Sequence, residues 1–383
     1  MPGLLPQVDP DGLLEYSVVY TDRALNHMSQ RFGGVMRDIS GVLKQAYAAH
    51  SAIVVPGSGS FGMEAVARQF GSGKKALVIR NGWFSYRWSQ IFDMGAIPAS
   101  HTVLKARTQS VGRQMPFAPA PLAEVLQAIR DQRPELVLAP HVETSSGMLL
   151  PDDYLRAVAD AVHEVGGLFV LDCIASGALW VDMKSSGVDL LVSAPQKGWS
   201  GSPCCAFVML SERARQAIDG TVSTSFAMDL KKWLQIMETY EGGGHGYHAT
   251  LPTDALTLTR DAMLQTRAMG LEAARAAQWD LGRKVRALME RHGLPSVAAK
   301  GFQAPGVVVS YTDDMGLHSG KAFAAQGVQS ASGVPLQCDE PADFKSFRIG
   351  LFGLDKLGDV DGTVKRLEQA LMHILNISER AAA

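Results

Sequence analysis

The sequence predicts an α/β fold, with a large domain built on a mostly parallel central sheet and a smaller α+β domain at the carboxyl end. Between residue 51 and about residue 210, apolar runs of strand length alternate with helical patterns. This alternation is typical of a parallel sheet that is covered by helices on both faces. After Pro252 the sequence changes to a long segment rich in alanine, leucine, arginine and methionine. We expect this segment to form one helix that leaves the large domain and ends near Glu290.

Each expected element has a local signal. The strands are short apolar runs at residues 51–55, 76–79, 135–139 and 167–172, and in the run that begins at Val188. A glycine loop follows the first strand and opens a helix that ends at Phe70. Pro151 opens another helix, whose apolar residues recur at helical spacing until Gly166. The small domain is expected to contain strands at residues 306–310 and 347–351 and a final helix over residues 358–376. The expected division is an N-terminal arm (1–16), a large domain (17–268) and a small domain (269–383).

Composition and charge restrict the classes of function. The 383 residues are 46% hydrophobic, enough for a large core, and the formal net charge is only −2 with both signs interspersed. This pattern argues against a nucleic-acid partner and a membrane surface, and no apolar run is long enough to span a bilayer. Residues 1–6 show no secretory signal pattern. The four cysteines have no metal-ligand spacing, so we expect buried thiols and no metal. Together these features predict a cytoplasmic protein with a small-molecule ligand.

A lysine stands at the end of the apolar run that begins at Val188. In Val188-Asp-Leu-Leu-Val-Ser-Ala-Pro-Gln-Lys197, the strand stops among small residues. Burial of an ammonium group is unfavourable, and a desolvated lysine is a better nucleophile because its pKa falls. Lys197 is therefore a candidate for imine formation with a carbonyl cofactor, although a surface loop lysine would give the same local pattern.

The preceding strand ends in Asp172, about twenty-five residues before Lys197. An acid and a lysine at the carboxyl ends of successive parallel strands lie where open α/β sheets bind ligands. The pair fits pyridoxal phosphate, because the lysine forms the imine and the carboxylate keeps the pyridine nitrogen protonated. Taken alone, Asp172 is also compatible with a strand-end turn or a helix cap. Together the two residues predict a catalytic pair.

The glycine loop has more than one interpretation. Gly57-Ser-Gly59-Ser-Phe-Gly62 is a G-x-G-x-x-G sequence between a strand and a helix, as in dinucleotide-binding proteins. The next strand, however, runs into Arg80 instead of the acid that binds the NAD ribose, so only NADP fits, with Arg80 facing its extra phosphate. Backbone N–H groups at a helix N-terminus also bind other phosphates, here with Ser58, Gly59 and Ser60 as donors. A purely structural glycine turn is the third interpretation.

Seven ordered motifs between about residue 50 and residue 355 resemble those of class V aminotransferases. These are pyridoxal phosphate enzymes of fold type I, and they include the alanine–glyoxylate and serine–pyruvate aminotransferases. The resemblance is carried by Pro56-Gly-Ser-Gly-Ser60, Asn81-Gly-Trp-Phe84, His141-Val-Glu-Thr144-Ser-Ser-Gly147, Asp172-Cys-Ile174, Ser193-Ala-Pro-Gln196-Lys197, Tyr247-His-Ala-Thr250-Leu-Pro and Phe347-Arg348-Ile-Gly-Leu.

The resemblance implies how these segments hold the cofactor. Phe84 would stack on the cofactor ring, Ile174 would cover the opposite face, and Thr144 would approach the phenolic oxygen. The complete set of implied cofactor contacts within one chain is Ser58, Gly59, Ser60, Phe84, Thr144, Asp172, Ile174, Gln196 and Lys197.

Three further residues take their roles from the same resemblance. Tyr247 and Thr250 would reach the cofactor phosphate of the neighbouring subunit, which implies a homodimer. Arg348 would bind the substrate α-carboxylate, and a planar guanidinium suits a carboxylate because two parallel hydrogen bonds form. A structural ion pair remains the alternative for Arg348, and simple core packing remains the alternative for Phe84.

The chain also departs from the family pattern. Residues 13–28 replace a Gly-Pro-Gly-Pro segment that is common in the family, so the roles of Asn26 and His27 are open. Residues 337–345 resemble an insertion just before Arg348, and we expect this stretch to reshape the substrate pocket.

The predicted function is amino transfer from a small amino acid, such as alanine or serine, to a small 2-oxo acid, such as pyruvate or glyoxylate. The alternatives are an aminophosphonate transaminase, or a lyase or cysteine desulfurase on the same fold, for which Cys338 is the candidate thiolate. An NADP-dependent oxidoreductase follows only from the glycine loop. A binding protein without catalysis leaves Lys197 and Asp172 without a use.

Overall fold

The computed structural model describes residues 8–375, and its centre is a seven-stranded sheet in the order β1-β11-β10-β9-β6-β2-β3. The strands are β1 (Ser51–Pro56), β2 (Lys75–Arg80), β3 (Ser100–Lys105), β6 (Leu136–Pro140), β9 (Leu168–Asp172), β10 (Leu190–Ser193) and β11 (Cys205–Leu210). Strand β11 is antiparallel to both of its neighbours, and the other adjacent strands are parallel. The predicted mostly parallel α/β sheet is therefore confirmed.

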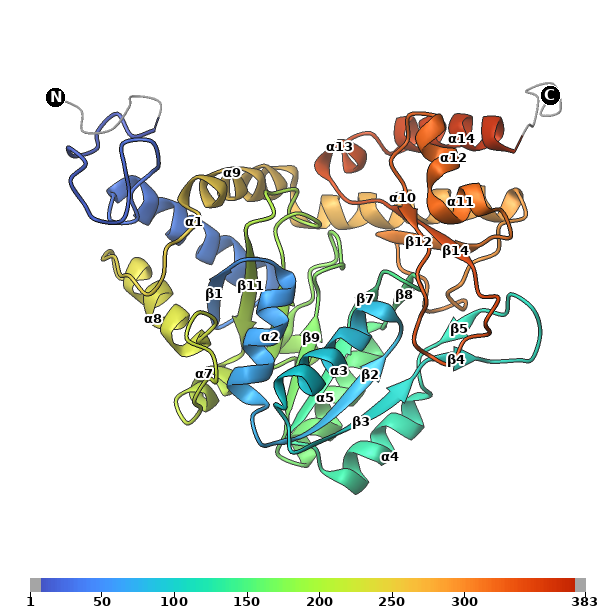
Figure 1. The fold of residues 1–383 in the computed structure, drawn as a ribbon, viewed down its shortest axis with the longest axis horizontal. Coiled ribbons are helices and arrows are strands. Elements are labelled where there is room, and N and C mark those ends of the chain that lie inside the picture. Colours follow the sequence, from blue (N-terminus) through green and yellow to red (C-terminus); the bar gives the residue numbers. More distant parts are fainter. Residues whose placement is uncertain (1–7, 376–383) are drawn as a thin grey trace.

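Helices pack against this sheet (Figure 1). Those of the large domain are α1 (Gln30–Tyr47), α2 (Gly59–Phe70), α3 (Trp83–Gly95), α4 (Leu122–Gln132), α5 (Asp152–Glu164), α6 (Met183–Ser186), α7 (Glu212–Ile218) and α8 (Leu230–Glu241). The helices predicted to end at Phe70 and to begin after Pro151 are α2 and α5. Helix α2 begins shortly after β1 ends, and α3 begins shortly after β2 ends, so the N-termini of both helices lie beside ends of strands of this sheet.

The long helix expected after Pro252 is wrong in one respect, because the structure has two helices there. Helix α9 (Thr253–Met269) ends at Gly270, and α10 (Leu271–Arg291) begins directly after it. Gly270 has a φ of 92°, which interrupts the regular helical backbone and which glycine adopts with little strain. This break lies close to the expected domain boundary at residue 268, and the boundary itself stays a prediction.

The carboxyl-terminal part contains a three-stranded sheet in the order β12-β14-β13. Its elements are β12 (Val307–Tyr311), α11 (Met315–Ser319), α12 (Lys321–Ala325), β13 (Ala331–Ser332), β14 (Ser346–Gly350), α13 (Leu354–Leu357) and α14 (Val360–Ile374). In Figure 1, helices α11, α12 and α14 lie above this sheet, and the seven-stranded sheet lies to its left and below it. The predicted final helix is α14, and residue 376 of that prediction lies outside the described residues.

Four short strands form two further two-stranded sheets, β4-β5 and β7-β8. They are β4 (Arg107–Thr108), β5 (Phe117–Ala118), β7 (Val142–Glu143) and β8 (Met148–Leu149). The N–H of Phe117 donates to the carbonyl of Val297, and the N–H of Leu149 donates to the carbonyl of Phe302. These backbone contacts attach the segment before β12 to the large domain.

All four cysteines are buried and free, as the sequence predicts. No helix within residues 8–375 is both long enough and apolar enough to cross a membrane. Within the same residues, no three histidine, cysteine, aspartate or glutamate side chains are grouped so that they would hold a metal ion.

Candidate active site

Asp172 and Lys197 lie at the carboxyl ends of two neighbouring parallel strands. Asp172 is the last residue of β9 and is paired in register with Val192 of β10. Lys197 lies in the turn that follows β10. Asp172 is 7% exposed, and Lys197 is partly buried. The fold thus brings the predicted acid and the predicted lysine to the same edge of the sheet.

Burial shifts the ionisation of both groups toward their neutral forms. Burial raises the pKa of Asp172 to about 6, against the opposing effects of the Ile174 N–H at 2.9 Å and of the Lys197 charge. Burial also lowers the pKa of Lys197, and the Arg348 and Arg87 charges lower it further, while Asp172 acts in the opposite direction. A lysine with a lowered pKa has more free amine available to attack a carbonyl.

The Asp172 shift predicts how the stability of the cofactor-free protein depends on pH. Because the pKa of Asp172 rises from 3.8 in the unfolded chain to about 6 in the folded chain, the folded state binds the proton more tightly. The contribution of Asp172 to the free energy of unfolding is therefore greatest below pH 4. It falls by about 3 kcal/mol between pH 4 and pH 6 and is constant above that range. Urea unfolding of the wild type and of Asp172→Asn checks this, since their difference should change with pH in that window. A constant difference from pH 4 to pH 7 would contradict the shift.

Two aromatic rings and an arginine surround the lysine. The Lys197 Nζ lies 6.0 Å from the centre of the Phe84 ring and 5.7 Å from that of Phe352. The Arg348 Cζ lies 5.5 Å from the centre of the same Phe84 ring. Arg348 belongs to β14, which places the predicted carboxylate-binding residue of the small domain beside the predicted lysine of the large domain. Phe352, four residues after Arg348, was not predicted from the sequence.

The side chain of Arg348 is held by a backbone acceptor and not by an acid. Its Nε donates to the carbonyl of Ser332 at 2.8 Å. Among the ion pairs found within residues 8–375, none includes Arg348. The structural ion pair that was the alternative for Arg348 therefore has no counterpart in the described part of the chain.

The glycine loop forms the N-terminus of α2. Ser58 precedes the helix, its side chain makes no capping hydrogen bond, and Gly59 and Ser60 begin the helix. Ser60 Oγ accepts a hydrogen bond from Arg87 Nη1 at 2.8 Å. Arg87 was missed from the sequence, although it lies three residues after Phe84 and thus on the same side of α3. Free helix N–H groups with an arginine beside them suit a phosphate group.

Ile174 packs directly on this loop. A Cβ atom added to Gly59 would lie 2.6 Å from Ile174 Cδ1. Ile174 is partly buried, and its backbone N–H is bound to Asp172. The residue that the sequence assigns to one face of the cofactor ring thus lies between the acid and the glycine loop.

Thr144 has a polar atom with no protein partner. Its side chain is 6% exposed, and among the described residues its Oγ1 has no hydrogen-bond partner. An unpaired buried hydroxyl is unfavourable, so a ligand with a polar atom at this point would compensate for the loss. This orphaned hydroxyl, together with Asp172 and the helix N-terminus, fits a cofactor that has a phenolic oxygen, a ring nitrogen and a phosphate.

Three predicted residues lie outside this group of contacts. Gln196 is exposed and directly precedes Lys197 in the same turn. Tyr247 and Thr250 are exposed, and the hydroxyl of Tyr247 lies 3.1 Å from Thr250 Oγ1. In the described chain, this hydroxyl pair makes no hydrogen bond with Ser58, Ser60 or Lys197. Their predicted role in a neighbouring subunit stays a prediction.

Asn26 and His27 are held within the N-terminal region of their own chain. Asn26 Nδ2 donates to a carboxylate oxygen of Glu15 at 2.7 Å. The His27 ring lies 5.5 Å from that of Tyr20 and 5.5 Å from that of Tyr247, centre to centre. Burial and the neighbouring His245 lower the pKa of His27.

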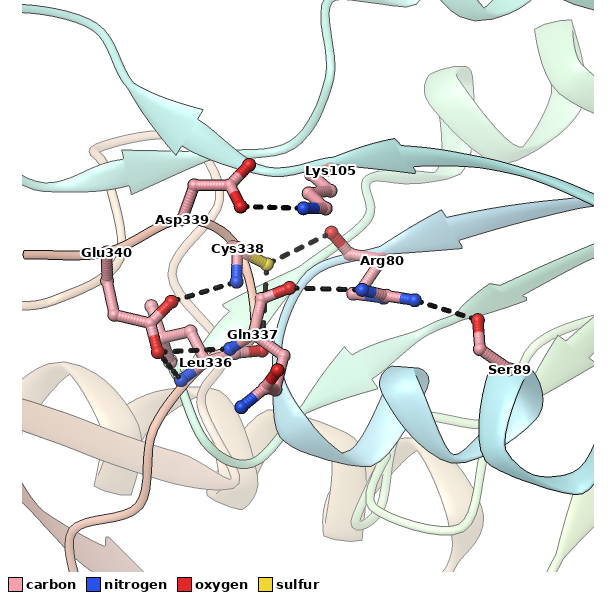
Figure 2. Close-up of polar contacts among 8 residues, drawn as sticks. All are labelled: Arg80, Ser89, Lys105, Leu336, Gln337, Cys338, Asp339 and Glu340. Atoms are coloured by element: carbon pink, nitrogen blue, oxygen red, sulfur yellow. Dashed lines mark hydrogen bonds and ion pairs between the residues drawn. The ribbon is translucent and has the colours of Figure 1, made fainter. Parts of the chain in front are cut away.

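Figure 2 shows why Arg80 is unsuited to an NADP phosphate. Its Nη1 donates to the carbonyl of Gln337 at 3.2 Å, and its Nη2 donates to Ser89 Oγ at 2.8 Å. Tyr86 lies over the guanidinium, 4.6 Å from Cζ to the ring centre. Arg80 is only 7% exposed, so the group is already used inside the protein.

The same view shows Cys338, the candidate thiolate of a desulfurase, in contact with Arg80. Cys338 is 3% exposed, and its sulfur lies 3.5 Å from the carbonyl oxygen of Arg80. Burial raises the pKa of Cys338 to about 12. A desulfurase needs an accessible thiolate on a mobile loop, and Cys338 has neither property. Its loop is instead fixed by Glu340, whose carboxylate accepts from the N–H groups of Leu336, Gln337 and Cys338.

Gly198 makes a close contact that predicts a measurable loss of stability. A Cβ atom added at Gly198 would lie 2.1 Å from the carbonyl oxygen of Gly177, so backbone would have to move. We expect Gly198→Ala to lower the free energy of unfolding by about 1–3 kcal/mol and to displace the Lys197 turn. Gly34→Ala is the matched control, because that Cβ would meet no atom within 4 Å on helix α1, and it should be neutral or slightly stabilising. Equal melting temperatures for Gly198→Ala and the wild type would refute this packing.

Comparisons with known proteins agree with this geometry. Residues 13–315 match the family described as Aminotransferase class-V. The chain belongs to the class V aminotransferases. It is therefore an aminotransferase whose cofactor is pyridoxal phosphate.

The sequence identity to individual relatives is below 30%. A protein of Paraburkholderia phymatum named 2-aminoethylphosphonate–pyruvate transaminase is 28% identical over 362 residues, which are 92% of this chain and 90% of that protein. A Synechococcus protein named soluble hydrogenase, small subunit, is 26% identical over 365 residues, 91% of this chain and 88% of its own. The crystal structure of alanine–glyoxylate aminotransferase from Nostoc has a TM-score of 0.74 at 23% identity and covers 90% of this chain and 88% of that one. The last comparison shows the shared fold.

Proposed function

We propose that the protein transfers an amino group from a small amino acid to a small 2-oxo acid, with pyridoxal phosphate bound at Lys197. The observation that carries this proposal is the meeting of three charged groups from separate elements. Asp172 ends β9, Lys197 follows β10, and Arg348 comes from β14. Lys197 Nζ and Arg348 Cζ lie 6.0 and 5.5 Å from the centre of the Phe84 ring.

Different residues of the chain would bind the phosphate, the phenolic oxygen and the ring of the cofactor. Ser58, Gly59, Ser60 and Arg87 would hold the cofactor phosphate, Gln196 would assist them, and Thr144 Oγ1 would bind the phenolic oxygen. Phe84 and Ile174 would enclose the ring between them. The orphaned Thr144 hydroxyl and the Arg87–Ser60 contact of 2.8 Å support this assignment.

The chemistry then rests on three side chains. When bound, pyridoxal phosphate draws electron density away from the carbon that bears the amino group. Asp172 would keep the ring nitrogen protonated through a charge-assisted hydrogen bond. Arg348 would fix the substrate carboxylate, and Lys197, as a free amine, would take the proton from the substrate α-carbon. The lowered pKa of Lys197 supports this role.

The names of relatives bear on the choice of substrate pair. Relatives carry the names 2-aminoethylphosphonate–pyruvate transaminase and alanine–glyoxylate aminotransferase. Alanine or serine with pyruvate or glyoxylate, the pair implied by the motifs of the sequence, is our first choice, and an aminophosphonate donor is the second. A lyase or desulfurase activity is disfavoured because Cys338 is buried.

A donor screen tests the substrate proposal. The protein loaded with pyridoxal phosphate is mixed with one donor at a time and no acceptor, and the visible absorbance of the bound cofactor is followed. Alanine or serine should change this absorbance and then yield their 2-oxo acids in stoichiometric amounts. A response to 2-aminoethylphosphonate alone would select the second choice. No response to any amino donor would refute amino transfer.

We also propose a cytoplasmic homodimer in which Tyr247 and Thr250 serve the partner's cofactor phosphate. The exposure of Tyr247, at 54%, and of the apolar residues Leu13, Tyr16 and Val18 supports an interface on this side of the chain. The four free, buried cysteines support a reducing compartment.

Mixed dimers test the assignment of Tyr247. Lys197→Ala and Tyr247→Ala chains are purified as a heterodimer with two different tags. If Tyr247 binds the cofactor phosphate of the partner subunit, one of the two sites in the heterodimer contains both Lys197 and Tyr247. The heterodimer should then have half of the wild-type activity per dimer. Activity no higher than that of the two parent homodimers would refute this role.

A further inference from the structure

Glu143 is a buried carboxylate that lies in the site but has no role in the function proposed above. It ends the short strand β7 and is fully buried. None of the ion pairs found within residues 8–375 includes it. A buried charge without a cation is unfavourable unless hydrogen bonds compensate for the lost water.

The N-terminus of helix α3 supplies these hydrogen bonds. Glu143 Oε1 accepts from the N–H of Phe84 at 3.1 Å, and Oε2 accepts from the N–H of Ser85 at 2.8 Å and from its hydroxyl at 2.7 Å. Ser145 completes the arrangement, since its hydroxyl donates to Oε1 at 2.7 Å and accepts from the N–H of Trp83 at 2.9 Å. The first three N–H groups of α3, which lack partners within the helix, are all satisfied. The positive end of the helix also favours a negative charge here.

Gly82 shows that this contact is a close one. A Cβ atom at this position would lie 2.0 Å from Ser145 Oγ and 2.8 Å from Glu143 Cγ. Only a glycine therefore lets the β2–α3 connection approach the carboxylate. The Asn81-Gly82 pair before the helix and the acid on β7 form one packed unit.

We infer that Glu143 is a positioning residue that acts through Phe84. Its carboxylate fixes the backbone of Phe84, and thereby the ring that lies beside Lys197 and Arg348. This inference rests on the proposed function, because Phe84 is taken to stack on the cofactor. It adds that the geometry of the stacking ring depends on an anion that itself touches neither cofactor nor substrate.

A double-mutant cycle tests the inference without measuring turnover. The dissociation constant of pyridoxal phosphate is measured by absorbance titration of the cofactor-free wild type, Glu143→Gln, Phe84→Ala and the double variant. Glutamine keeps the shape but loses the charge, and its amide N–H₂ faces N–H donors. We expect Glu143→Gln to weaken binding by about 10- to 100-fold in the wild type and by less than about threefold in the Phe84→Ala background. Visible circular dichroism of the bound cofactor should change in Glu143→Gln, because it reports how the cofactor is seated.

The controls separate this inference from general damage. Asp359→Asn removes another helix-capping carboxylate, which accepts from the N–H of Gly362 at 3.0 Å on α14, and should leave cofactor affinity unchanged. If Glu143→Gln does not fold, Ser145→Ala takes its place in the cycle with the carboxylate intact. Equal losses with and without Phe84 would overturn the inference while the proposed function stands. A wild type that binds no pyridoxal phosphate would instead refute the proposed function.

Discussion

Lys197→Ala is expected to abolish the covalent attachment of pyridoxal phosphate and to lower kcat/KM for amino transfer by at least about 10³-fold. Two losses combine in this variant. The amine that bonds to the cofactor is gone, and so is the base that takes the α-proton. Water that enters the space left by the side chain is a much weaker base than an amine, so it does not replace Lys197. Visible spectra and steady-state kinetics measure the two losses separately.

A second lysine of the sheet gives the matched control. Lys105 ends β3, as Lys197 follows β10, but its Nζ pairs with Asp339 at 2.7 Å near the surface. Lys105→Ala should retain the bound-cofactor spectrum and the activity. Added methylamine should restore part of the rate of Lys197→Ala, because a free amine then replaces the missing base. A Lys197→Ala variant with wild-type spectrum and rate would refute the assignment.

Arg348→Gln is expected to lower kcat/KM for amino acid donors by about 10²-fold, mainly through KM. Loss of a charge-assisted hydrogen bond costs about 1.5–3 kcal/mol, and an arginine can form two such bonds with a carboxylate. The Arg348 Nε is bound to the carbonyl of Ser332 at 2.8 Å, which fixes the guanidinium plane. Steady-state kinetics with alanine and serine measure the effect.

An amine without a carboxylate provides the control for Arg348. A simple alkyl amine should react with the loaded wild type and with Arg348→Gln at similar slow rates, because it makes no contact with the guanidinium. Arg348→Lys should recover only part of the loss, since an ammonium group lacks the planar pair of donors. An equal loss for the amine and for alanine would mean that Arg348 supports the fold and not the carboxylate.

The sequence was sufficient for the elements with strong local signals. The buried strands are continuous apolar runs, so β1, β2, β6, β9 and β10 were predicted, and Lys197 and Asp172 stand out because they end such runs. Helix α1 was not predicted, although its buried side chains Phe32, Met36, Ile39 and Leu43 recur at helical spacing. The break at Gly270 was missed because one glycine in a helical pattern is often tolerated.

The remaining site residues depend on tertiary contacts. Arg87 becomes notable only because α3 brings it to Ser60, and Phe352 only because the small domain brings it to Lys197. Glu143 stands within a motif of the sequence, but its function follows from the helix N-terminus that it meets. The roles proposed for Tyr247 and Thr250 involve a second chain, so neither the sequence nor one folded chain is enough to establish them.

The central claim is that Lys197 is the amine that holds pyridoxal phosphate. The most direct measurement is borohydride reduction of the loaded protein, followed by proteolysis and mass spectrometry, because reduction fixes the cofactor to the amine that carries it. We predict a single labelled peptide, with the cofactor mass on Lys197 and no label on Lys105. Label on another lysine, or no label on a protein that retains amino transfer activity, would contradict the account.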